Sequence, residues 1–70
     1  MQKLAVIRPD FLNQELGVPV GNGYYRSKTP LPYRWVNKNN VESPDGDIFQ
    51  IQLLGVWQNA QSIDFDFIEQ

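Results

Sequence analysis

The sequence predicts a mainly β fold, a small antiparallel β-roll or partly open barrel of SH3-like size, in a single domain spanning residues 1–70. Apolar and polar residues alternate towards the C-terminal end, as in half-buried strands. Glycine and proline are frequent between the apolar segments, where turns are needed. Only residues 10–16 have the pattern of a helical turn. We therefore expect about five short strands and at most one short helical turn.

The first predicted strand covers residues 3–8, because its centre is an unbroken run of four apolar residues. Such a run suits a short strand that is buried on both faces. Pro9 ends the strand because it lacks a backbone N–H. A helical turn capped by Asp10 is expected over residues 11–16, and Gly17 is placed to end it.

The middle of the chain predicts a hairpin that is followed by an extended segment and another strand. Residues 21–23 read Gly-Asn-Gly, all of which tolerate positive φ, so they predict a turn. This turn joins strands over residues 18–20 and 24–26. Two prolines keep residues 29–32 extended, and a strand is predicted over residues 33–38.

The C-terminal half combines two predicted turns with the clearest strand pattern. Residues 37–40 are polar, and residues 43–46 read Ser-Pro-Asp-Gly, which suits a type I turn followed by a bulge. Residues 49–54 and 63–68 each alternate apolar and polar side chains. We expect these two segments to pair as an antiparallel hairpin with one aromatic-aliphatic and one acidic face, with a bulge or coil at Gly55.

Charge is segregated along the chain. The first fifteen residues are neutral overall, residues 16–41 carry four cations and no anion, and residues 42–70 carry six anions and no cation, which gives a net charge of −2. Such segregation predicts strand order. If the strand with Arg34 and Lys38 lies beside the C-terminal strand with its aspartates, cross-strand ion pairs compensate much of the asymmetry.

Several kinds of chemistry are disfavoured by the composition. Histidine and cysteine are absent, so the commonest general base, the usual nucleophile pairs and the commonest transition-metal ligands are missing. We predict no enzyme activity, no cofactor and no metal site. Asp64 and Asp66, about 7 Å apart on one strand face, could serve a hydrolase. Residues 45–47 with Glu42 resemble a fragment of a calcium loop, although turns and a soluble strand edge explain both patterns more simply.

Aromatic and basic residues are interleaved in the middle of the chain. Tyrosine, tryptophan and arginine are enriched at the energetic centres of protein interfaces. We therefore predict a non-catalytic domain that acts through protein–protein contacts, as a homo-oligomer or as an accessory subunit. Among the cations, Arg26 and Lys28 lie in a loop with no expected partner. The predicted partner-binding residues are Tyr24, Tyr25, Arg26, Lys28, Tyr33, Arg34 and Trp35.

A second interpretation is single-stranded nucleic-acid binding through residues 24–38. Aromatic rings stack on bases and cations meet phosphates in proteins of that class. The six anions that follow this segment weaken attraction to a polyanion, so protein binding is the first interpretation.

The N-terminal residues carry no predicted membrane or export segment. The apolar run at residues 4–7 is shorter than the roughly 7–15 residues of a secretory signal and the about 20 residues of a membrane span. The sequence therefore predicts a cytoplasmic protein without a membrane partner.

Overall fold

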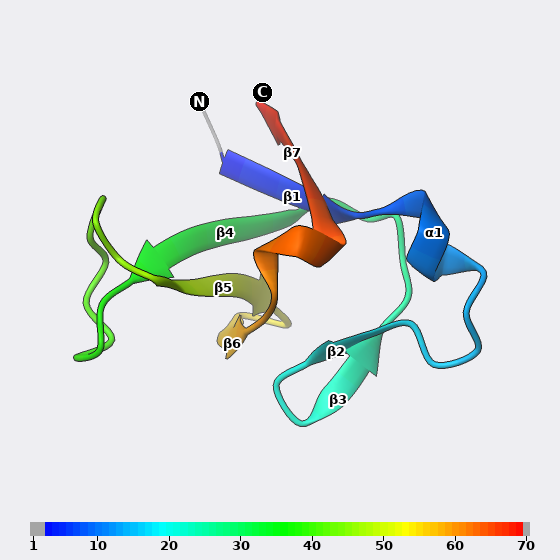
Figure 1. Ribbon diagram of the computed structural model, residues 1–70, viewed down its shortest axis with the longest axis horizontal. Helices are drawn as coiled ribbons and strands as arrows, with labels where there is room; N and C mark the ends of the chain where they lie inside the picture. Colours follow the sequence, from blue (N-terminus) through cyan, green and yellow to red (C-terminus); the bar gives the residue numbers. More distant parts are fainter. Residues whose placement is uncertain (1–2, 70) are drawn as a thin grey trace.

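The computed structural model describes the backbone of residues 3–69 and the side chains of residues 3–68. It contains a five-stranded antiparallel sheet with the order β6-β5-β4-β1-β7 and a two-stranded sheet, β2-β3 (Figure 1). The elements are β1 (Lys3–Ile7), α1 (Pro9–Leu12), β2 (Val18–Val20), β3 (Gly23–Tyr25), β4 (Leu31–Val36), β5 (Ile48–Leu53), β6 (Val56–Asn59), the 3-10 helix η1 (Ser62–Asp64) and β7 (Phe65–Glu69).

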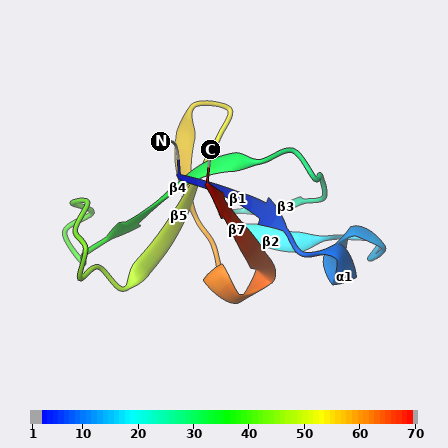
Figure 2. The same cartoon turned by 90° about the horizontal axis from the view of Figure 1, so that it is seen from above.

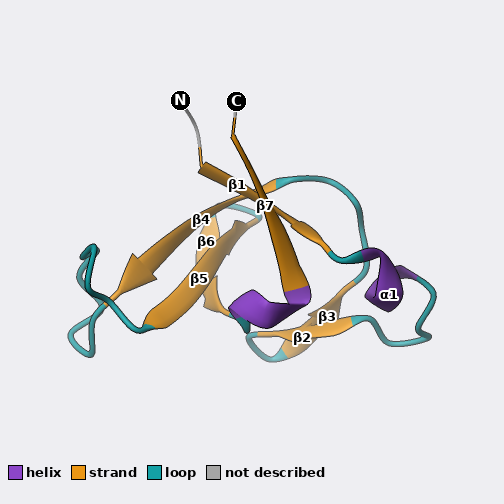
Figure 3. Cartoon of the chain, turned by 45° about the horizontal axis from the view of Figure 1, so that its top comes forward, coloured by secondary structure: helices purple, strands orange, loops and turns teal. Residues whose placement is uncertain are grey.

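The five-stranded sheet curls around the core, and the β2-β3 hairpin lies across its open side (Figure 3). The backbone N–H of Gly21 in this hairpin donates to the carbonyl of Asn59 at 3.0 Å and so links the two sheets. Edge strands β6 and β7 do not pair with each other, so the barrel is partly open. The mainly β prediction is confirmed. The core consists of Ala5, Ile7, Val18, Val20, Tyr25, Leu31, Phe49, Ile51 and Phe65.

The predicted pairing of residues 49–54 with residues 63–68 is wrong. Strand β5 instead pairs with β6 through a two-residue turn, in which Leu54 and Gly55 have φ of 53° and 79°. Positive φ at both central residues is the geometry that matches the twist of a tight hairpin. Strand β7 pairs with β1, so the first and the last strand lie side by side (Figure 2).

The strand order also overturns the predicted ion pairs between Arg34 and the C-terminal aspartates. Strand β4 lies between β5 and β1, and Arg34 is opposite Gln50. The C-terminal strand contributes a different pair, in which Nε of Arg8 is 3.6 Å from Oδ1 of Asp66. Both side chains are about half exposed, so this pair contributes little to stability. Lys38 lies beyond the end of β4, in the following turn.

The helical turn begins earlier than predicted and is shorter. Pro9 occupies the first turn of α1, where a missing N–H costs nothing because no intrahelical acceptor is available there. Arg8 is the N-cap residue, and Asp10 lies inside the first turn rather than capping it. Gly17, expected to end the helix, instead adopts φ of 78° just before β2. Within residues 3–69, no helix is long and apolar enough to cross a membrane.

The loop between β4 and β5 contains both predicted turns and covers the end of β4. The N–H of Asn40 donates to the carbonyl of Asn37 at 2.8 Å, and the N–H of Gly46 donates to the carbonyl of Ser43 at 3.0 Å. A Cβ atom at Gly46 would lie 2.6 Å from the backbone of Val36, which is completely buried. Close backbone approach explains this glycine, because its φ is not among the positive values that the predicted bulge needs.

Candidate functional site

The seven predicted partner-binding residues do not form a single surface. Tyr24 is 58% exposed on β3, whereas the neighbouring Tyr25 is a core residue whose hydroxyl donates to the carbonyl of Thr29 at 2.6 Å. Lys28 is exposed in the loop between β3 and β4. The remaining four residues are Arg26, Tyr33, Arg34 and Trp35.

Arg26 has partners that the sequence did not indicate. Its Nη1 donates to the carbonyl of Glu15 at 2.7 Å, and its Nη2 donates to the carbonyl of Leu12 at 3.4 Å. The guanidinium therefore ties the segment after α1 to the segment after β3. The expectation that Arg26 lacks a partner within the chain is wrong, because backbone carbonyls take the place of a carboxylate.

Tyr33 and Trp35 lie on the inner face of β4 and extend the core towards the surface. The centroid of the Tyr33 ring is 4.9 Å from that of Phe67 and 5.7 Å from that of Phe49. Trp35 is tilted against Phe49 with the centroids 5.2 Å apart. Both residues are half-buried, so their rings are held rigidly by neighbours while one part of each stays accessible.

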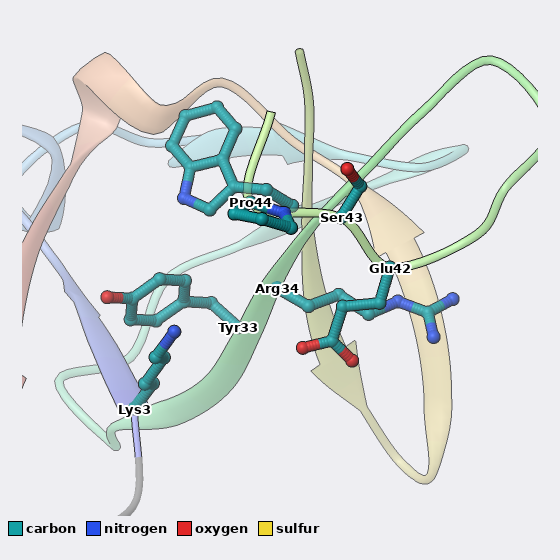
Figure 4. Close-up of a pocket in the computed structure, with 7 residues that line it drawn as sticks. Lys3, Tyr33, Arg34, Glu42, Ser43 and Pro44 are labelled. Atoms are coloured by element: carbon teal, nitrogen blue, oxygen red, sulfur yellow. The ribbon is translucent and has the colours of Figure 1, made fainter. Parts of the chain in front are cut away.

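A cavity of about 620 Å³ opens beside these two rings (Figure 4). Its far wall is the loop that follows β4, which the N–H of Ser43 holds in place by donating to the carbonyl of Trp35 at 3.0 Å. A bridge between Val36 and Glu42 fixes the same loop. The residues that line the cavity are Lys3, Tyr33, Arg34, Trp35, Glu42, Ser43 and Pro44.

Arg34 lies on the opposite face of β4, in a network of polar side chains. Its Nε donates to Oε1 of Gln50 at 2.8 Å, and its guanidinium carbon is 4.4 Å from the centre of the Trp57 ring. Gln50 is only 6% exposed, and its Nε2 donates to Oδ1 of Asn40 at 3.0 Å and to Oδ1 of Asn59 at 2.8 Å. These contacts fix the plane of the guanidinium before any ligand arrives.

The structure therefore brings three predicted residues to one cavity and adds others that the sequence did not single out. Lys3 reaches the cavity only through the strand order, which no local pattern reveals, whereas residues 42–44 reach it through the loop that follows β4. Gln50 had no distinguishing indication, because it alternates with apolar residues just as Gln52 does. Trp57 had none beyond its residue type.

The carboxylate alternatives find no shared site. Asp64 belongs to the 3-10 helix and Asp66 to β7, where it pairs with Arg8, so the two do not alternate along one strand face as predicted. In the part of the chain that the structure describes, no three acidic side chains gather as a metal site would need. Asp45 instead lies in the turn closed by Gly46, and Asp47 follows that turn.

Comparison with known proteins adds no relative to this geometry. The chain matches no protein-family model, no curated protein and no solved structure.

Proposed function

We propose that the protein is a non-catalytic β-domain that binds another polypeptide through the cavity between β4 and the loop of residues 42–44. The observation that carries this proposal is the accessible aromatic wall formed by Tyr33 and Trp35. Rings held rigidly by their neighbours lose little conformational entropy on binding, which favours their use as interface anchors. The partner is either a different protein, for which the domain is an accessory subunit, or a second copy of the chain.

The residue composition supports a binding role over a catalytic one. The chain has neither histidine nor cysteine, and the cavity is lined by rings, a proline and a few charged groups. Grooves lined by aromatic side chains are a recurring means of binding extended polypeptide segments.

Affinity capture from an extract of the source cells, with bound proteins identified by mass spectrometry, tests this proposal. The variant Pro44→Glu places a longer, charged side chain at the cavity, and Pro30→Glu makes the same change at an exposed proline outside it. We expect wild type and Pro30→Glu to retain the same protein and Pro44→Glu to lose it. If wild type and both variants capture the same proteins, the cavity is not the binding site.

Light scattering coupled to size exclusion separates the two kinds of partner. A mass that corresponds to more than one chain, and that falls to one chain in Pro44→Glu but not in Pro30→Glu, identifies the partner as a second copy. A monomer that captures nothing in the previous experiment contradicts the proposed function.

A further inference from the structure

We propose that Arg34 binds a carboxylate of the partner, so that the segment entering the cavity is acidic. This inference rests on the proposed function, because it names the charge of the polypeptide that occupies the same cavity. It assigns distinct tasks to three residues of the outer face: Arg34 binds, Gln50 positions, and Trp57 supports.

The guanidinium of Arg34 is held in place while its outer nitrogens stay free. Its Nε is committed to Gln50, and one face of its plane lies over Trp57. Among the described residues, Nη1 and Nη2 of Arg34 make no hydrogen bond. A planar pair of N–H groups matches the two oxygens of a carboxylate, and an arginine that is ordered beforehand loses less entropy when it binds.

Gln50 orients the guanidinium group of Arg34. Its Nε2 is bound by Asn40 and Asn59, which leaves Oε1 turned towards Nε of Arg34. Burying an amide is costly unless its polar atoms are paired, and here each of its polar atoms has a partner. Gln50 does not line the cavity, so it acts on a ligand only through Arg34.

The charges around the cavity favour one anionic group rather than a polyanion. Within residues 3–68, no carboxylate oxygen lies within 4.0 Å of a nitrogen of Arg34. The lining has two cations, Lys3 and Arg34, against the single carboxylate of Glu42, although the whole chain has a net charge of −2. A nucleic acid is a long polyanion, so the net negative charge of the protein repels it. A single carboxylate is attracted mainly by the local excess of cations.

The view of the cavity shows how these charges are arranged (Figure 4). The Arg34 side chain leads away from Tyr33 and Lys3, and its guanidinium lies beside Gln50 and Trp57 on the opposite face of β4 from the aromatic wall. Glu42 lines the same cavity and repels an incoming carboxylate. An acidic segment with an apolar side chain against the rings therefore continues past β4, where its carboxylate meets the guanidinium.

An NMR titration of the ¹⁵N-labelled protein tests the inference with two peptides, N-acetyl-Leu-Pro-Glu-Leu-amide and its counterpart with glutamine in place of glutamate. We expect the glutamate peptide to bind at least about fivefold more tightly and to shift the Nε–H resonance of Arg34. The variant Arg34→Lys keeps the charge but loses the paired donors, and should bind the glutamate peptide roughly tenfold more weakly. Lys38→Met, which removes an exposed cation outside the cavity, should change nothing.

Two further variants test the charge near the site and the positioning role of Gln50. Glu42→Gln removes a negative charge that repels the carboxylate of the peptide, and we expect the glutamate peptide to bind about twofold to threefold more tightly. Gln50→Met removes the partner of Nε, and the preference for the glutamate peptide over the glutamine peptide should fall towards one. If Gln50 had only a structural role, Gln50→Met would weaken the binding of both peptides equally and leave that preference unchanged. This result would contradict its positioning role.

The outcomes distinguish this inference from the proposed function. If both peptides bind equally and Arg34→Lys has no effect, the carboxylate site is refuted and the polypeptide-binding cavity stands. If no resonance of the protein shifts when the glutamate peptide is added up to its solubility limit, the carboxylate site is also refuted. The capture experiment decides the proposed function separately. If the octanucleotide dT8 displaces the glutamate peptide and its affinity falls steeply with salt, both are refuted in favour of nucleic-acid binding.

Discussion

Oε1 of Gln50 accepts a hydrogen bond of 2.8 Å from Nε of Arg34, so the most buried polar side chain among the described residues holds the cation of the candidate site. We predict that Gln50→Leu destabilises the fold by about 1–3 kcal/mol, because Nε of Arg34 and the Oδ1 atoms of Asn40 and Asn59 lose their partner in a part-buried network. Urea denaturation measures the change as a shift of the midpoint.

The matched control for this prediction is Gln52→Leu. Gln52 lies two residues further along β5, on the same face, and is half-buried without a side-chain hydrogen bond among the described residues. We expect the free energy of unfolding of the Gln52→Leu variant to stay within about 0.5 kcal/mol of the wild-type value. Equal losses in the two variants would show that the network around Gln50 contributes nothing beyond packing.

Gly46 is required by its surroundings rather than by its backbone conformation. A Cβ atom there would lie 2.6 Å from the carbonyl carbon and oxygen of Val36 and 2.8 Å from its nitrogen. Backbone cannot rotate away as a side chain can, so we predict that Gly46→Ala costs about 1–3 kcal/mol. The loss should also disturb the wall of the cavity, because Ser43 and Gly46 close the same turn.

Gly23→Ala is the comparison for Gly46→Ala in thermal and urea unfolding. A Cβ atom at Gly23 would meet no neighbouring atom within 4 Å, and Gly23 does not have a positive φ. The substitution there should be neutral or stabilise the fold by up to about 1 kcal/mol, since it restricts the unfolded chain. A larger loss at Gly23 than at Gly46 would contradict the steric explanation.

Local sequence signals were sufficient for the positions of two turns and for the fold class. Turns form at residues 21–22, within the Gly-Asn-Gly sequence, and at residues 43–46, although Gly46 lacks the positive φ of the predicted bulge and Gly23 already belongs to β3. Each depends on residues within a few positions of one another, which is the range over which residue type restricts the backbone. The alternation of apolar residues likewise indicated strands around a single core.

Strand pairing could not be predicted in the same way. Alternation shows that a strand has two faces, but it does not show which strand lies next to it. In the pairing of β1 with β7, Lys3 lies opposite Glu69, although the two residues are almost the full length of the chain apart in sequence. The candidate cavity depends on such pairing, because Lys3 reaches Tyr33 only through the β1-β4 contact.

The turn between β5 and β6 could not be recognised from its residue types because its first residue is unusual. Leu54 has φ of 53°, a conformation that side chains other than those of glycine, asparagine and aspartate rarely adopt, and it is 97% exposed. We predict that Leu54→Asn stabilises the fold by about 0.5–1 kcal/mol, since asparagine tolerates this conformation and no packing is lost. Thermal unfolding should show a higher midpoint.

Leu16→Asn provides the control for Leu54→Asn. Leu16 is also exposed, at 59%, but does not have a positive φ. Its replacement should not raise the midpoint. If the unfolding midpoint rises equally in both asparagine variants, the added stability comes from removing exposed apolar surface and not from relief of backbone strain at the turn.

The adjacent tyrosines of β3 should respond differently to the loss of their hydroxyl groups. Tyr25 points into the core and its hydroxyl donates to the carbonyl of Thr29 at 2.6 Å, whereas Tyr24 is exposed and makes no side-chain hydrogen bond among the described residues. We predict that Tyr25→Phe lowers the free energy of unfolding by about 0.5–1.5 kcal/mol and that Tyr24→Phe leaves it within about 0.5 kcal/mol of wild type. Urea denaturation of the two variants measures both values. A loss confined to Tyr24→Phe would reverse the assignment of which ring faces the core, and with it the reason for excluding Tyr25 from the binding surface.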